Sequence, residues 1–315
     1  MQKSAQNNSE MATTPFMNVR TDYGFKRIFG DIRNKKILLS MLNAFLTDYI
    51  GVIEDIELLN TEQLGVTKEH KRMSYDLYGK EQDKRRFIVE MQRGKLRFYV
   101  RRAVSYMSRA IDNSLTKGDP EYELPEMLSL NFLDYEDCSI IKPDRYIQRV
   151  MLKNDENEIF FEEMMYIFVN LCIFASGKGR ESRSEPKQKW GFYMKNMENL
   201  TEEDVRDETG VFKEFIELCR LSNLNKKEMK EYKKSVLEYH DVKSAIQCAS
   251  EDSYAEGLAE GIEAGMTEGR QAGLAEGKRS IILQMLNNGV TVPMISKLTG
   301  LSEAEVLAAS KGSDN

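Results

Sequence analysis

Residues 71–79, KRMSYDLYG, and residues 86–92, RFIVEMQ, decide the fold, because each has the composition of a β-strand and a short polar stretch separates them. We therefore predict an antiparallel hairpin. Side chains alternate between the two faces of a strand, so one apolar face is expected to carry Met73, Tyr75, Leu77, Phe87, Val89 and Met91. The other face is expected to carry Asp76, Glu90 and Gln92.

One register satisfies both faces. Placing Asp76 opposite Glu90 also sets Leu77 against Val89. Two carboxylates directly opposite each other lie about 5 Å apart and repel. A divalent cation between them removes this repulsion, and hard oxygen ligands suit Mg²⁺ or Mn²⁺. Such a pair is suited to phosphodiester hydrolysis. The alternative is an ordinary exposed hairpin face, which the apolar character of the second strand disfavours.

The flanking segments predict a mixed α/β sheet. Residues 20–47 repeat apolar side chains at helical spacing, residues 52–60 resemble a strand, and residues 96–115 form an amphipathic basic helix. Residues 127–135 resemble another buried strand, and the order strand, strand, helix, strand indicates a mixed sheet. Residues 144–152 and 158–174 add apolar, buried material without indicating helix or strand.

The composition narrows the possible chemistry. The chain has four cysteines without a CxxC pair and only two histidines, so reduced cytoplasmic thiols and carboxylate chemistry are expected. No apolar run approaches the length of a membrane span. The net charge is −6, but basic residues concentrate between Lys68 and Arg109. This concentration predicts contact with a phosphate backbone, and a solvated, salt-bridged face explains the charge about as well.

The order of these motifs resembles the Rpn-type recombination-promoting nuclease and transposase family of the PD-(D/E)XK nuclease superfamily. The matching stretches are TDYGFKRIFG (21–30), NKKILLSMLNAFL (34–46), IELLNTEQ (56–63), the Asp76 strand, IVEMQ (88–92), the basic helix, GDPEYELPEMLSLNFLDY (118–135), a glycine-periodic segment and TGLSEAEV (299–306). The resemblance implies a restriction-endonuclease-like mixed sheet core flanked by helices, with a C-terminal helical extension. It also implies a Mg²⁺-dependent DNA endonuclease that promotes recombination or transposition-like rearrangement.

Site residues follow from the resemblance by position. Asp76, Glu90 and Gln92 would be catalytic, and Asp76, Glu90 and the backbone carbonyl of Met91 would hold the metal. Gln92 stands where the superfamily usually has lysine, which puts lysine-assisted chemistry in doubt, and Lys71 or Arg102 could supply the missing charge. The expected DNA contacts are Lys71, Arg72, Arg93, Arg102 and Tyr106, and Asp22 and Lys26 would border the site. A structural cap is an equally good explanation of Asp22, as packing is of Arg102 and Tyr106.

The remaining sequence predicts the domain organisation. We expect a disordered tail over residues 1–14, the nuclease core over 15–175, a linker and helical region over 176–250, a glycine-periodic helix over 251–280 and a small helical module over 281–315. Residues 176–189 are expected to form a loop or linker, and Ser302 with Glu305 a capping box. Glycines recur every fourth residue from Gly257 to Gly277, which predicts a helix–helix contact and a possible homo-oligomer, against the alternative of a frayed acidic linker. The competing functions are a catalytically weak DNA-binding module and an oligomeric interaction protein.

Overall fold

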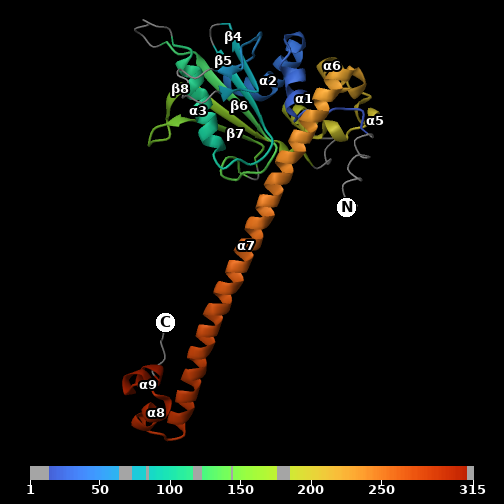
Figure 1. The fold of residues 1–315 in the computed structure, drawn as a ribbon. Helices are drawn as coiled ribbons and strands as arrows, with labels where there is room; N and C mark the ends of the chain where they lie inside the picture. The colour runs from blue at the N-terminus through green and yellow to red at the C-terminus, as the bar shows by residue number, and fades with distance from the viewer. Residues whose placement is uncertain are drawn as a thin grey trace. The chain divides into compact units, whose positions relative to one another are not determined.

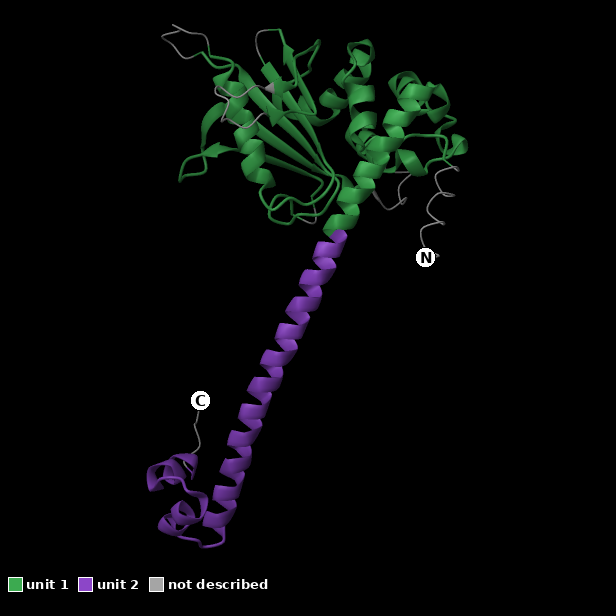
Figure 2. Ribbon diagram, in the orientation of Figure 1, with its two compact units in different colours: residues 1–246 green, residues 247–315 purple. Residues whose placement is uncertain are grey.

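The structure is a computed structural model that describes residues 14–63, 73–82, 85–115, 123–142, 145–175 and 185–310. The chain divides into two compact units, residues 1–246 and residues 247–315 (Figure 2). The first unit contains the sheet and the helices that pack on it. None of the helices formed by the described residues is long and apolar enough to cross a membrane.

The first unit is built on a six-stranded mixed sheet in the order β1-β4-β5-β6-β8-β7 (Figure 1). The central strands β5, β6 and β8 are parallel to one another, whereas β1, β4 and β7 pair antiparallel with their neighbours. The strands are β1 (Glu57–Leu58), β4 (Leu77–Glu81), β5 (Arg85–Gln92), β6 (Glu126–Leu133), β7 (Ile147–Lys153) and β8 (Ile159–Asn170), and a separate ladder joins β2 (Glu62–Gln63) to β3 (Met73–Ser74).

Helices cover both faces of this sheet. One face packs against α1 (Asp22–Phe29), α2 (Lys35–Ile50), α4 (Pro186–Asn196) and α6 (Gly210–Cys219), and the other against α3 (Tyr99–Asp112). The remaining short helices of this unit are α5 (Glu202–Val205), η2 (Ile32–Asn34), η3 (Leu171–Ala175), η4 (Met197–Asn199) and η5 (Leu221–Asn223). Strands covered on both faces have nearly continuous apolar sequences, which explains the composition of β5 and β6. The predicted mixed sheet flanked by helices is confirmed.

Alternation along β5 decides which side chains reach α3. Phe87, Val89 and Met91 point into the core beneath α1 and α2. Ile88 packs in the α3 core, and period-two alternation places Glu90 and Gln92 on that same face. The predicted register is present, since Leu77 pairs with Val89.

The first predicted strand, residues 71–79, is not continuous, and its expected face for Tyr75 is wrong. β3 ends at Ser74 and β4 begins at Leu77, while the Tyr75 N–H donates to the Thr61 carbonyl at 3.1 Å. Tyr75 packs with Tyr78 in the α3 core, and Leu77 packs in the opposite core. Alternation holds only along an unbroken strand, so the bend at Asp76 moves Tyr75 to the other face.

Two further expectations need correction. Only Glu57–Leu58 of residues 52–60 pairs with the sheet, so this strand is much shorter than its apolar sequence predicts. The loop expected over residues 176–189 ends early, because α4 begins at Pro186. Proline suits the first turn of a helix, where its missing N–H leaves no bond unmade. Residues 176–184 of this loop lie outside the described residues.

The second unit continues α7 (Lys226–Asn287) and adds α8 (Val292–Thr299) and α9 (Glu303–Ser310). Its small core contains Ile282, Ile295 and Val306. The predicted capping box is confirmed, because the Ser302 N–H donates to Glu305 at 2.8 Å and the Glu305 N–H donates to the Ser302 hydroxyl at 3.3 Å. The glycine-periodic segment is helical, as predicted.

Candidate active site

The bend before β4 brings the Asp76 and Glu90 carboxylates to the same place. The Asp76 N–H donates to Glu90 Oε1 at 3.1 Å, and the Met91 N–H donates to Asp76 Oδ2 at 2.8 Å. Each carboxylate therefore accepts a backbone hydrogen bond from the opposite strand segment. These bonds fix both side chains and hold Asp76 Oδ2 against the Met91 N–H.

Burial makes this pair electrostatically unfavourable when both groups are ionised, and the Asp76 charge acts further against ionised Glu90. Burial, followed by the Asp76 charge, raises the pKa of Glu90 from 4.5 to about 8, against the opposing effect of Arg102. Burial also raises the pKa of Asp76, although the Met91 N–H and Arg93 act in the opposite direction. Neighbouring carboxyl groups with raised pKa values are typical of functional sites.

Arg102 connects α3 to the carboxylate pair. Its Nη2 lies 3.0 Å from Glu90 Oε2, and its guanidinium lies 5.0 Å from the centre of the Tyr106 ring. Tyr106 packs edge-on against Tyr75 at 5.1 Å, which anchors this face of the helix. Within the described part of the chain, the buried Arg102 Nε has no hydrogen-bond partner. That N–H is suited to an incoming anionic oxygen.

Gln92 lies on the Glu90 side of β5 and is 8% exposed. Its Nε2 donates to the Gly94 carbonyl at 2.8 Å, and its backbone carbonyl accepts from the Asp134 N–H at 2.9 Å. The side chain is therefore held in place. Its amide can accept or donate hydrogen bonds but contributes no charge.

Asp22, Lys26 and Arg93 form a charged border near Asp76. Asp22 bridges Lys26 Nζ at 3.0 Å and Arg93 Nη2 at 3.4 Å, and Arg93 Nε donates to the Arg20 carbonyl at 2.9 Å. The Asp22 and Lys26 charges act on the pKa of Asp76 in opposite directions. The structure thus brings these residues to the edge of the pair, whereas Lys71 and Arg72 lie outside the described residues.

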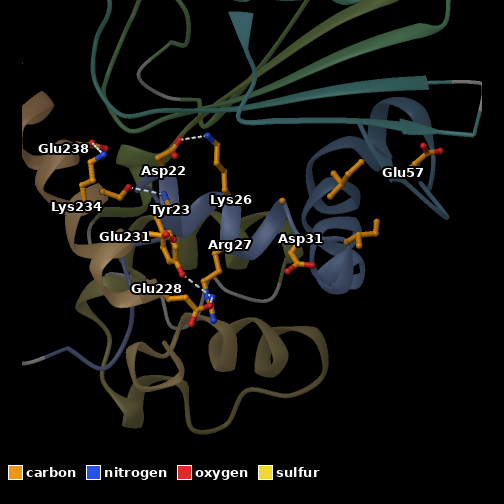
Figure 3. A pocket seen from close by; sticks show the side chains of 14 residues that line it. Asp22, Tyr23, Lys26, Arg27, Asp31, Glu57, Glu228, Glu231, Lys234 and Glu238 are labelled. Carbon is orange, nitrogen blue, oxygen red and sulfur yellow. Dashed lines mark hydrogen bonds and ion pairs between the residues drawn. The ribbon is translucent and has the colours of Figure 1, made fainter. Parts of the chain in front are cut away.

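A cavity of about 990 Å³ begins at this border and extends away along α1 (Figure 3). Asp22 and Lys26 line it on α1, and Glu228, Glu231, Lys234 and Glu238 line it on α7. Neither Asp76 nor Glu90 lines it. The paired carboxylates, rather than this cavity, therefore mark the candidate hydrolytic site.

A buried ionic cluster next to Gln92 was not expected from the sequence. The fully buried Asp134 carboxylate contacts Arg20 at 2.8 Å, Lys195 at 2.5 Å and Lys243 at 2.8 Å, and accepts from the Tyr239 hydroxyl at 2.7 Å. Burial raises the pKa of Asp134, but the three cations outweigh it and lower the pKa to about 2. A charged residue directly after the buried strand β6 was the available signal. Its partners on α4 and α7 could not be predicted, because no local sequence pattern marks them.

Comparison with family models identifies the family of the chain. Residues 19–249 match a family model described as PD-(D/E)XK nuclease family transposase. The match covers β1 to β8 and the helices on both faces of the sheet. Searches of curated proteins and of solved structures each found no match.

Proposed function

The chain belongs to the PD-(D/E)XK nuclease family of transposases, and we propose that it is a metal-dependent DNA endonuclease with its hydrolytic centre at Asp76, Glu90 and Gln92. The observation that carries this proposal is the contact between the Asp76 N–H and the Glu90 carboxylate, where burial raises both carboxyl pKa values and the Asp76 charge raises that of Glu90 further. Such a contact is relieved by a bound cation. We propose that cleavage promotes recombination or transposition-like rearrangement.

The donor set fits Mg²⁺. Nucleases of this superfamily generally use divalent metals, and Mg²⁺ is commonly bound through one or two carboxylates together with substrate phosphate and water. Among the described residues no group of three or more His, Cys, Asp and Glu side chains could hold a metal, which matches a two-carboxylate site. Asp76, Glu90 and the Met91 carbonyl would hold the ion, which when bound supplies a Lewis acid for the phosphoryl oxygen.

The protein's own groups supply positioning and charge. The unpartnered Arg102 Nε can donate to a non-bridging phosphate oxygen beside Glu90. Gln92 can orient a water molecule through its amide but cannot remove a proton, because an amide does not ionise. We propose that Arg102 and Arg93, with Lys71, Arg72 and Tyr106, contact the DNA, since arginine forks match phosphate oxygens.

A nicking assay tests this function. We expect the full-length chain to nick supercoiled plasmid in the presence of Mg²⁺ or Mn²⁺, and we expect EDTA to abolish this nicking. Asp76→Ala and Glu90→Ala should each lower the rate by more than about 100-fold, because losing even an indirect partner of a metal ligand typically lowers activity 10- to 100-fold. Recombination between plasmid markers in cells should fall with the same variants.

The exposed strand glutamate Glu162 on β8 provides the matched control. Glu162→Ala should nick at the wild-type rate. Cleavage that survives both Asp76→Ala and Glu90→Ala would remove the hydrolytic centre from this place.

A catalytically weak DNA-binding module is the second candidate function. It is favoured by the engagement of both Glu90 oxygens within the protein, one by the Asp76 N–H and one by Arg102. Binding of DNA without nicking in any divalent metal would support this candidate. We also propose that the glycine-periodic part of α7 joins two copies of the chain.

A further inference from the structure

The start of α3 carries large apolar side chains interleaved with arginines, and we call residues 96–104 the α3 entry surface. The side chains of Leu96, Phe98, Val100 and Val104 are 41% to 55% exposed. Arg97, Arg101 and Arg102 lie between them in the sequence. Isolated exposed apolar side chains are ordinary, but an apolar group of this density marks a surface that binds a partner.

Phe98 is the most exposed of the four apolar side chains, and two guanidinium groups lie over its ring. Arg97 lies 5.4 Å and Arg101 5.3 Å from the ring centre. Neither arginine forms an ion pair with a carboxylate among the residues that the structure describes. Two cations without a carboxylate partner in the described part of the chain therefore lie over the exposed Phe98 ring.

This aromatic face lies one helical turn from the candidate active site. The Arg102 N–H donates to the Phe98 carbonyl at 3.0 Å, and Arg102 Nη2 lies 3.0 Å from Glu90 Oε2. Residues four apart share a helix face and are separated by about 6 Å along the axis. A nucleic acid strand whose phosphate reaches Arg102 and Glu90 therefore brings an adjacent nucleotide to Phe98.

The chemistry of the α3 entry surface fits nucleic acid. A partner must offer anions to Arg97 and Arg101 and a flat apolar face to Phe98, and a single nucleotide offers both. Stacking of a base on an aromatic side chain strengthens binding by roughly 5- to 150-fold and tolerates any base, because every base has a π face.

Building on the endonuclease function proposed above, we propose that Phe98 stacks on an unpaired base beside the cleaved phosphate while Arg97 and Arg101 hold the flanking phosphates. In an intact duplex the base faces are covered by neighbouring bases, and exposing one requires unfavourable unstacking. The preferred substrate class is therefore DNA with an unpaired nucleotide at the cleaved position, such as single strands, bulges and junctions.

Binding of the full-length chain to single strands in EDTA tests this proposal independently of hydrolysis. The probes are a fluorescent oligothymidylate and a strand of equal length that is abasic throughout. Phe98→Ala should weaken binding of oligothymidylate about 10-fold and leave binding of the abasic strand unchanged. Phe98→Trp should bind oligothymidylate as tightly as the wild type. The control is Phe160→Ala on β8, which removes a phenylalanine that is 78% exposed and should change neither affinity.

The two strands separate stacking from other roles of Phe98. The proposal would be overturned if Phe98→Ala weakened binding of both strands equally or of neither. It would also be overturned if the protein bound phosphatidylglycerol vesicles through Phe98 but did not bind oligothymidylate. If Phe98-dependent binding occurs but the Mg²⁺ nicking assay shows no cleavage, the endonuclease function fails and the stacking site stands. If Asp76-dependent nicking occurs and Phe98→Ala binds like the wild type, the stacking site fails alone.

Discussion

Gln92 shares a strand face with Glu90 at a position where related nucleases usually have lysine. Its amide is buried and tied to the Gly94 carbonyl, so its contribution is directional and carries no charge. The cations that act on the carboxylate pair include Arg102, which bridges Glu90, and Arg93 and Lys26, which lower the pKa of Asp76. We propose that Arg102 from α3 and Arg93 directly after β5 supply the charge that lysine would supply.

Gln92→Ala should lower the plasmid nicking rate by roughly 10- to 100-fold, the usual effect of removing a group that orients a metal site. DNA affinity in EDTA should stay unchanged, because the substitution alters no charge and phosphate contacts depend on charge. Nicking rates with Mg²⁺ and anisotropy measurements in EDTA check the two expectations. A wild-type nicking rate would exclude Gln92 from the reaction.

The pairing of the two carboxylates could be predicted from the sequence because one register satisfies the apolar and polar faces together. The position of Tyr75 could not be predicted, because the alternation of side chains between the two faces fails at the bend near Asp76. Nothing in the local sequence marks that bend. The contact between Arg102 and Glu90 depends on how α3 docks on the sheet. Packing between distant elements, rather than local pattern, decides that docking.

At the scale of elements, Asp134 joins parts of the chain that are distant in sequence. Its carboxylate follows β6 and binds Arg20 from the segment before α1, Lys195 from α4, and Tyr239 and Lys243 from α7. Its backbone N–H also donates to the Gln92 carbonyl. This ionic cluster therefore fixes the end of β5, next to the carboxylate pair, relative to the surrounding helices.

Asp134→Asn should destabilise the protein by about 3 to 5 kcal/mol, because removing one partner of a buried ionic cluster leaves the others uncompensated. The pKa of Asp134 is depressed from 3.8 to about 2. Its stabilising contribution is therefore fully present above pH 3.8 and is lost as pH falls through about 2. Denaturant unfolding between pH 7 and pH 2 measures both effects.

Asp48→Asn is the control for this experiment, since Asp48 pairs with Lys187 on the surface and its side chain is 59% exposed. Exposed ion pairs contribute about 0 to 1 kcal/mol. If Asp134→Asn loses no more stability than Asp48→Asn, or shows the same decline of stability below pH 3.8 as the wild type, the cluster is not a structural anchor.

Helices and strands were predicted correctly where the spacing of apolar residues and the length of the segment indicated the same type of element, as in α2, α3 and β6. The segment that forms β7 and β8 gave no clear type, because β8 begins exposed and carries adjacent Glu162 and Glu163 before its buried half. Its apolar residues therefore matched neither a buried strand nor an amphipathic helix. The ionic cluster around Asp134 also escaped prediction, since its members meet only in the folded chain.

At the scale of the whole molecule, the glycine-periodic part of α7 has no internal packing reason for its glycines. A Cβ added to any of Gly257, Gly261, Gly265, Gly269, Gly273 or Gly277 would meet nothing within 4 Å in the described structure. Each glycine weakens the helix by about 1 kcal/mol relative to alanine. Close approach of a second copy of the chain would compensate for this weakness.

Replacing Gly261, Gly265 and Gly269 together by alanine should raise the helical stability of the chain and weaken its self-association, because each new methyl group keeps the paired backbones apart. Circular dichroism melting and sedimentation velocity check the two effects. Glu263→Ala lies on another side of the same helix and should leave association unchanged. If the triple variant sediments like the wild type, glycines 261, 265 and 269 are not an interface.

We propose that Asp76, Glu90 and the Met91 carbonyl hold a divalent metal. Crystals of the full-length protein soaked in Mn²⁺ and measured near the manganese absorption edge test it most directly. We expect an anomalous peak in contact with both carboxylates and this carbonyl, and its loss in Asp76→Ala. Mn²⁺-dependent nicking activity with no anomalous peak at this position, or with the peak elsewhere, would contradict the assignment.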